Sequence, residues 1–432
     1  MDSSLLSRLH GGRVHQAWIV AATTFVVLML TASVRGAFGL LIDPLSKQYG
    51  WSRTSITTAS TINLVLFGLM GPVAAALMVR FGLRRVVISA LITIASGSVL
   101  ATYSTAPWHL WVSWGLIMGI GQGCVATVLA ASVASVWFVD RRAMVSGILI
   151  AAGTAGTLVF LPLNRWLVDN YSWTRVSYVI AAACLASVPL VVMFVADRPE
   201  QVGTTAFGAP PGYKTPISPR NPLANAWAGL TESVHSGIFW LLLGSFTVCG
   251  ITTAGIVQVH FVDAAGDHGI ARSAASGLVV LIGVFDLVGV IGGGWLADRV
   301  DARTLLFCFY ALRGVSLLVL DNVLRAGTSR FVLIGAMALY GLDWVATVPP
   351  TVRLANELFP GRGTIVYGWV FAGHQLGGGA AAALAAWSRD QTGSFQTSFV
   401  VGGLLALVTA FACLGIARTP VVRVAQGAHV VT

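Results

Sequence analysis

The chain has 432 residues, of which 56% are hydrophobic and only 10% are charged. Soluble domains carry about 25% charged residues, so this composition excludes an ordinary soluble protein and indicates an integral membrane protein. The net charge of +10 does not indicate a nucleic-acid partner, because the basic residues are nearly all Arg in short clusters between apolar runs.

Twelve apolar segments follow one another along the chain, and most approach the roughly 20 residues that cross a bilayer as a helix. A lone strand cannot satisfy its backbone groups in lipid, so each segment is expected to be helical. The predicted fold is an all-α membrane protein, with twelve transmembrane helices in two six-helix pseudo-symmetric bundles. The expected limits are 16–42, 54–79, 84–104, 108–137, 143–167, 174–196, 236–263, 274–297, 303–324, 330–352, 363–388 and 395–417.

A long hydrophilic stretch, residues 197–235, separates the sixth and seventh segments and contains six prolines. This proline density predicts a linker loop without regular helix. The expected domains are therefore an N-terminal bundle over residues 1–196 and a C-terminal bundle over residues 236–432.

Basic residues in the short loops predict the orientation of the chain. Both termini and the linker lie on the more basic side, so they are assigned to the cytoplasmic face of a cell membrane. The loops on this side carry Arg8, Arg13, Arg80, Arg84, Arg85, Arg141, Arg142, Arg299, Arg303, Arg362, Arg418 and Arg423.

The two halves repeat each other in sequence. A shift of 221 residues places Phe138 on Phe359 and Arg141 on Arg362, at the ends of corresponding segments. Parallel repeats of this kind are the architecture in which secondary transporters bind substrate near the bilayer midplane. The repeat therefore indicates transport by alternating access.

The loop after the eighth segment contains Gly294, Asp298, Arg299 and Arg303. Their spacing resembles the cytoplasmic-loop signature of the major facilitator superfamily, G-x-x-x-D-R-x-G-R-R. The resemblance implies that these residues gate the cytoplasmic side. The corresponding loop after the second segment keeps one basic residue of this signature, Arg84.

Two further motifs resemble the monocarboxylate-porter and oxalate/formate-exchanger branch of that superfamily. Tyr49-Gly50-Trp51-Ser52-Arg53 precedes the second segment, and Trp137-Phe138-Val139-Asp140-Arg141-Arg142 precedes the fifth. The resemblance implies a transporter rather than an enzyme, with no cofactor or metal, working as a monomer in the lipid bilayer.

Ionisable residues inside lipid are costly, so each one is a candidate functional residue. Asp286, Arg313 and Asp343 fall near the middle of segments eight, nine and ten. We expect them to couple transport to protons, because burial favours the protonated form of a carboxyl group and a nearby Arg favours the charged form. Members of the branch carry Arg one turn after the acid of segment eight, where this chain has Val290. Arg313 could replace that Arg, or it could simply neutralise Asp343 as a structural pair.

The substrate is expected to be a small organic anion. Arg35, in the first segment, is placed where the branch carries a basic substrate-binding residue, although an Arg here could also extend to the membrane surface. His374 and Gln375 are expected to line the cavity, against the alternative that such residues serve packing. Weaker candidates of the same kind are Asn63, Gln122 and His260.

Three functions remain open at this stage. Transport of small carboxylates, by proton symport or in exchange for another anion, is the preferred interpretation. Efflux of drugs or metabolites by proton antiport is the alternative, but the N-terminal half is poor in the buried acids that such a pump requires. A membrane sensor would need a signalling domain for which the tails are too short.

Overall fold

The computed structural model describes residues 14–210, 221–325 and 327–417, apart from the side chains of Arg35 and Gly36. The described residues are mostly helical, and the backbones of Phe138 and Phe207 form an isolated β-bridge. The helices form twelve columns, which confirms the predicted twelve-helix fold. Ten of the columns are long and apolar enough to cross a membrane, by length and composition.

The columns agree with the predicted segments to within a few residues at most ends. In chain order they are α2–α3 (Gln16–Thr31 and Ser33–Tyr49), α4 (Arg53–Phe81), α5 (Leu83–Ala101), α6–η1–α7–α8 (Pro107–Leu110, Trp111–Ile117, Met118–Cys124 and Thr127–Trp137), α9 (Arg142–Asn170), α10 (Trp173–Phe194), α12–η3–α13 (Gly237–Gly250, Ile251–Val257 and Gln258–Asp267), α14 (Arg272–Ala297), α15 (Ala302–Leu324), α16–α17 (Arg330–Asp343 and Val348–Leu358), α18 (Gly363–Thr392) and α19 (Gln396–Leu414).

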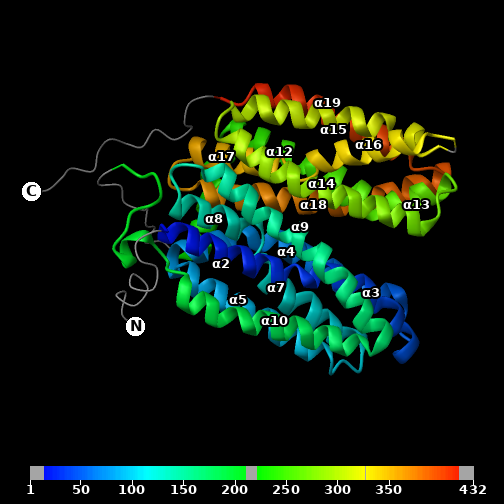
Figure 1. Cartoon of the computed structure of the whole chain (residues 1–432), viewed down its shortest axis with the longest axis horizontal. Helices are drawn as coiled ribbons and strands as arrows, with labels where there is room; N and C mark the ends of the chain where they lie inside the picture. Colours follow the sequence, from blue (N-terminus) through cyan, green and yellow to red (C-terminus); the bar gives the residue numbers. More distant parts are fainter. Residues whose placement is uncertain (1–13, 211–220, 326, 418–432) are drawn as a thin grey trace, which may run out of the picture.

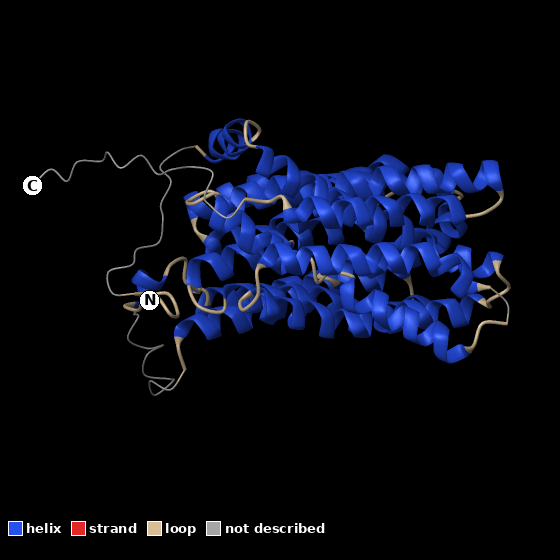
Figure 2. Cartoon of the chain, turned by 90° about the horizontal axis from the view of Figure 1, so that it is seen from above, coloured by secondary structure: helices blue, strands red, loops and turns tan. Residues whose placement is uncertain are grey.

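The first six columns form one bundle and the last six form another, and the two lie side by side along their length (Figure 1). The second view shows the same elongated, all-helical body (Figure 2). We call these bundles the first and second halves. The end at which α2 begins and α19 ends is called the proximal end, and the opposite end is the distal end.

Three columns are interrupted along their length. The first is interrupted at Ala32, between α2 and α3, and the fourth is interrupted between Cys124 and Thr127, where α7 ends and α8 begins. The tenth column stops at Asp343 and restarts at Val348, directly before Pro349 and Pro350. Pro349 and Pro350 lack N–H groups and both lie in the first turn of α17, where this loss is least costly.

The linker contains more structure than its prolines predict. Residues 222–233 form a 12-residue helix, α11 (Pro222–Ser233), so the expectation of no regular helix in this loop is wrong. Pro222 occupies the first turn, where its missing N–H costs nothing, and Asn221 caps the helix by accepting from the N–H of Leu223.

Helix α11 lies across both halves, in contact with α4 and α18. Glu232 forms an ion pair with Arg362, and the indole of Trp369 donates to the carbonyl of Ala226 at 2.9 Å. These contacts attach the linker to the proximal end of the molecule.

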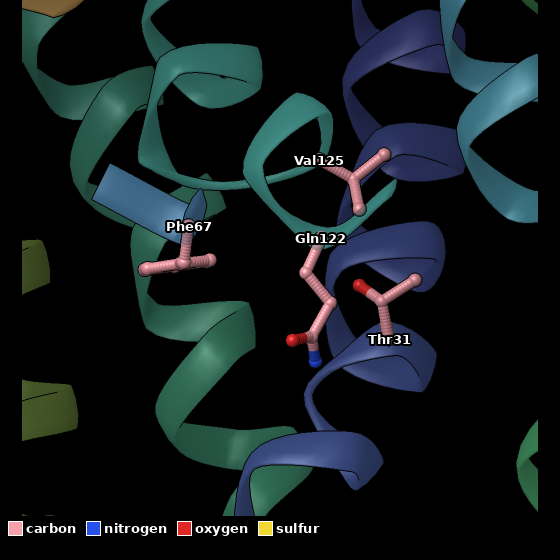
Figure 3. A pocket seen from close by; sticks show the side chains of 4 residues that line it. All are labelled: Thr31, Phe67, Gln122 and Val125. Atoms are coloured by element: carbon pink, nitrogen blue, oxygen red, sulfur yellow. The ribbon is translucent and has the colours of Figure 1, made fainter. Parts of the chain in front are cut away.

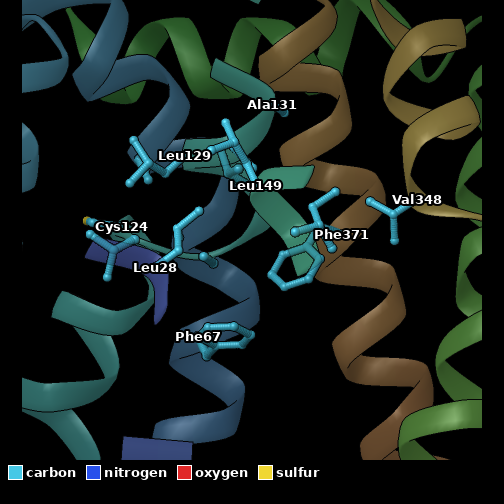
Figure 4. Close-up of a cluster of buried hydrophobic side chains, with 14 of the residues drawn as sticks. Leu28, Phe67, Cys124, Leu129, Ala131, Leu149, Val348 and Phe371 are labelled. Atoms are coloured by element: carbon cyan, nitrogen blue, oxygen red, sulfur yellow. The ribbon is translucent and has the colours of Figure 1, made fainter. Parts of the chain in front are cut away.

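The halves meet chiefly along two helix pairs, α4 with α18 and α9 with α14, and also where α8 meets α18 and α9 meets α17. Small residues allow close approach: a Cβ at Gly368 would lie 2.6 Å from the backbone of Pro72, and one at Gly147 would lie 2.5 Å from the carbonyl of Val290. The buried core continues across the α4–α18 pair, where Phe67 and Phe371 form an edge-on contact at 5.4 Å (Figure 4).

Candidate functional site

Asp286 lies in the middle of α14, and 1% of its surface is exposed. Its carboxylate accepts two hydrogen bonds, one on each oxygen. The hydroxyl of Thr154, on α9 of the first half, donates to Oδ2 at 2.6 Å. The backbone N–H of Val345 donates to Oδ1 at 3.0 Å. Asp286 is therefore a buried acid that touches both halves.

Arg313 and Asp343 form an ion pair between α15 and α16. Nε of Arg313 donates to Oδ2 of Asp343 at 2.9 Å, and Nη2 donates to Oδ1 at 3.0 Å. The guanidinium therefore binds the carboxylate through two parallel hydrogen bonds. The two side chains are 0% and 1% exposed. Because this guanidinium is engaged by Asp343, it does not replace the missing Arg beside Asp286 by direct contact.

The break in the tenth column completes both of these sites. Residues 344–347 leave backbone groups without helical partners, and such groups are tolerated at membrane depth only where protein satisfies them. Arg313 Nη2 donates to the carbonyls of Asp343 and Trp344, at 2.5 and 3.1 Å. Val345 supplies its free N–H to Asp286. The interruption of this column thus supplies backbone donors and acceptors that hold two buried charges.

His374 and Gln375 lie near this network on α18. Nδ1 of His374 lies 2.8 Å from Oε1 of Gln375, and the imidazole packs against the rings of Phe246 and Phe371. Gln375 also lies at the junction of the halves, since a Cβ at Gly68 of α4 would be 2.6 Å from its own Cβ.

Gln122 lines a small pocket within the first half, together with Thr31, Phe67 and Val125 (Figure 3). Its side chain extends from the end of α7 toward Thr31 beside the interruption of the first column. This places a buried amide next to the end of α2, in the same column as Arg35. Arg35 itself lies within α3, but its side chain is outside the described part of the structure.

The other two polar candidates are bound inside their own halves. The amide of Asn63 donates to the carbonyl of Trp114 at 2.9 Å, between α4 and η1. Nε2 of His260 lies 2.8 Å from the carbonyl of Ala382, and its ring stacks on Phe395. Their described contacts join neighbouring helices.

The loop signature after α14 lies at the proximal end and contacts the first half through its acid. Both oxygens of Asp298 accept from the first turn of α9, from the N–H groups of Ala143 and Met144, each at 2.9 Å. Gly294 permits this approach, since a Cβ there would lie 2.6 Å from the carbonyl of Ala143.

The three basic residues of the two signatures contact their own halves. The guanidinium of Arg299 lies 4.1 Å from the ring centre of Trp295, and Arg303 pairs with Asp301 and donates to the carbonyl of Ile416. In the first half the backbone N–H of Arg84 donates to Asp197 at 2.8 Å.

Two contributors to the site were not singled out from the sequence. Thr154 is a hydroxyl on an otherwise apolar stretch of α9, which is a weak signal by itself. Cys249, which accepts from Nη1 of Arg313 at 2.9 Å, is indistinguishable in sequence from an ordinary buried Cys.

Two six-helix bundles around buried charges define a multi-pass membrane protein of the secondary-transporter class. The family model of the Major Facilitator Superfamily matches residues 24–262 and 260–429, so the chain belongs to this superfamily. It is a membrane transporter and not an enzyme.

Several relatives match nearly the whole chain. "Monocarboxylate transporter 13" of Rattus norvegicus is 29% identical, over 90% of this chain and 86% of its own length. "Monocarboxylate transporter 11" of Mus musculus is 28% identical, over 93% and 87%. These matches support the monocarboxylate-transporter branch to which the sequence motifs point.

Solved structures share the fold at low sequence identity. The E. coli fucose:proton symporter FucP, in the outward conformation, has a TM-score of 0.66 at 15% identity, over 94% of this chain and 100% of its own. The proton:xylose symporter XylE has a TM-score of 0.72 at 14% identity, over 93% and 96%.

Proposed function

We propose that this transporter carries small organic anions of the monocarboxylate type across a cell membrane, by proton symport and alternating access between its two halves. The relatives that match along most of the chain are named as monocarboxylate transporters. The observation that carries the proton-coupling part is Asp286, a buried carboxylate hydrogen-bonded by both halves.

The chemistry of Asp286 supports this role. A buried carboxyl group can take up and release a proton as its surroundings change, because burial favours its neutral form whereas hydrogen bonds to the carboxylate favour its charged form. The nearest guanidinium, Arg313, is engaged by Asp343. An anionic substrate that approached Asp286 would favour protonation further, which links proton binding to substrate binding.

Arg35 is proposed to attract the anion, with Gln122, His374 and Gln375 as further cavity residues. Asn63 and His260 are proposed to support the helices that carry them, since each contacts a backbone carbonyl of a neighbouring helix.

The proximal end is proposed to be the cytoplasmic end, because the basic loops, the start of α2 and the end of α19 belong to it. The contacts between halves run from Asp298 at this end to Thr154 and Asp286 near the middle. We therefore infer that the structure represents an outward-facing state closed at the cytoplasmic side, with Gly294 and Asp298 as part of the gate. The transporter is proposed to act as a monomer.

The test is uptake of labelled carboxylates by the purified protein in liposomes, with and without an inward proton gradient. We expect accumulation with the gradient, and Asp286→Asn should reduce accumulation to the level reached without it. Asp263→Asn is the matched control, because this acid is half-exposed and pairs with Arg272; it should accumulate substrate like the wild type.

Two results would change the assignment. Uptake only into vesicles preloaded with another anion would replace proton symport by exchange. No uptake of any carboxylate would remove the proposal, and a drug-susceptibility panel would then test efflux by proton antiport.

A further inference from the structure

Thr154 is the hydroxyl that joins the first half to the buried acid of the second. Its Oγ1 donates to Oδ2 of Asp286 at 2.6 Å, from α9 to α14. The other donor to Asp286, the N–H of Val345, belongs to the same half as the acid. A separation of α9 from α14 would therefore break the Thr154 bond and leave the Val345 bond intact.

The strength of the Thr154 bond depends on the charge of Asp286. A hydrogen bond to an ionised carboxylate is roughly twice as strong as one between neutral groups. Deprotonation of Asp286 therefore strengthens the contact between halves, and protonation weakens it.

The charged residues around Asp286 are bound to other partners, so the pH-dependent contact between the halves is the one made by Thr154. Helix α14 packs against α9, α13, α15, α16 and α17. The charged groups that act on Asp286 are Arg313 of α15 and Asp343 of α16, which are paired with each other. Charged residues of the remaining elements pair elsewhere, as Arg165 does with Asp169, Asp263 with Arg272, and Arg353 with Glu357.

We propose that Thr154 is the positioning residue through which the protonation of Asp286 controls the balance between the two arrangements of the halves. This rests on the proposed function, because it assumes that the halves move relative to each other during transport. With Asp286 ionised, Thr154 stabilises the proximally closed arrangement seen here. When Asp286 takes a proton, this stabilisation falls and the opposite arrangement gains population.

The test measures the arrangement directly, without substrate. Spin labels on Tyr171→Cys and Phe331→Cys report the separation of the halves at the distal end, where both residues are exposed. Cys308→Ser removes the exposed cysteine, while the other four are buried. Distances are measured in nanodiscs as the pH is lowered from about 8 to about 5, a range that spans the titration of a buried carboxyl group.

In the otherwise unmodified protein, lowering the pH should raise the population with the shorter distal distance by about fivefold, the difference between a charged and a neutral hydrogen bond. Thr154→Val, which keeps the shape and removes the donor, should abolish most of this pH response. Thr154→Ser should preserve it. Thr157→Val is the matched control, because its hydroxyl bonds to the carbonyl of Gly153 in its own helix; it should respond like the unmodified protein.

A pH response that persists in a folded Thr154→Val protein would overturn the inference, as would its loss in Thr154→Ser. These outcomes are separate from those of the uptake assay. A protein that carries no carboxylate but loses its pH response only in Thr154→Val would refute the proposed substrate and retain the role of Thr154.

Discussion

Arg313 and Asp343 show how the surroundings of a charge decide its contribution to stability. Both side chains are buried, and the guanidinium also binds two backbone carbonyls and a sulfur atom. Bringing two ions out of water is costly, and mutual attraction repays this cost only with good geometry and further hydrogen bonds. Here both conditions hold, so the pair is stable only as a complete unit.

We predict that Asp343→Asn destabilises the protein by about 3–5 kcal/mol, because it leaves Arg313 buried and uncompensated. The double variant Arg313→Leu with Asp343→Leu should lose much less, since neither charge remains. Thermal unfolding in detergent measures both. As a control, Arg165→Ala removes an exposed pair on α9 and should cost less than about 1 kcal/mol.

An unfolding temperature of Asp343→Asn equal to that of the wild type would contradict this prediction. The double variant also separates the two roles considered for the pair. If it folds and still accumulates substrate, the pair is structural; if it folds and does not, the pair takes part in transport.

At the scale of helices, one carboxylate joins elements from different halves. Asp298 ends α14 and accepts from the N–H groups of Ala143 and Met144, in the first turn of α9. The N-terminus of a helix carries partial positive charge and unpaired donors, so an acid is stabilising there. Because the acid and the helix belong to different halves, this bond stabilises the proximally closed arrangement.

Asp298→Ala should weaken this closure by about 1–2 kcal/mol, the usual contribution of a capping side chain with a favourable charge. Labels on Phe81→Cys of α4 and Leu414→Cys of α19, which are exposed near the proximal end, should show a larger population with separated halves.

Asp301 offers a control with the same chemistry. It caps α15, accepting from the N–H of Arg303, which is a contact within the second half. Asp301→Ala should lower stability without changing the label distances. Equal distances in Asp298→Ala and the wild type would show that Asp298 does not hold the halves together.

For the whole molecule, the packing of α4 against α18 limits which arrangements are possible. At Gly368 an added Cβ would lie 2.6 Å from backbone atoms of Pro72, which cannot move aside as a flexible side chain can. Protein interiors are close-packed, so even one methyl group at such a contact is destabilising.

Gly368→Ala is therefore expected to destabilise the proximally closed arrangement by about 1–3 kcal/mol. The population should then shift toward the arrangement in which the halves are separated at the proximal end. The same proximal labels measure the shift. Gly379→Ala is the control on the same helix, because nothing lies within 4 Å of its added Cβ. An unchanged distance distribution in Gly368→Ala would argue against this contact as a determinant of the state.

The sequence by itself determined the number and limits of the membrane helices. A membrane helix must satisfy its own backbone and expose apolar side chains to lipid, so the constraint is local and remains visible in each run of residues. The loop signature and the branch motifs identified the superfamily for the same reason, since they are short and contiguous. The buried charges Asp286, Arg313 and Asp343 also stood out, because ionisable residues are rare in such runs.

Only the tertiary structure decided how those residues are used. That Arg313 binds Asp343, that Asp286 binds Thr154, and that Asp298 caps α9 depend on contacts between helices distant in sequence. Helix α11 escaped prediction because its one proline, Pro222, is harmless at a helix start and because the helix packs on α4 and α18. Hydropathy and short motifs depend on each segment alone, because each helix must satisfy its own backbone and match the lipid around it. Which side chains bind one another depends instead on how helices that are distant in sequence pack together.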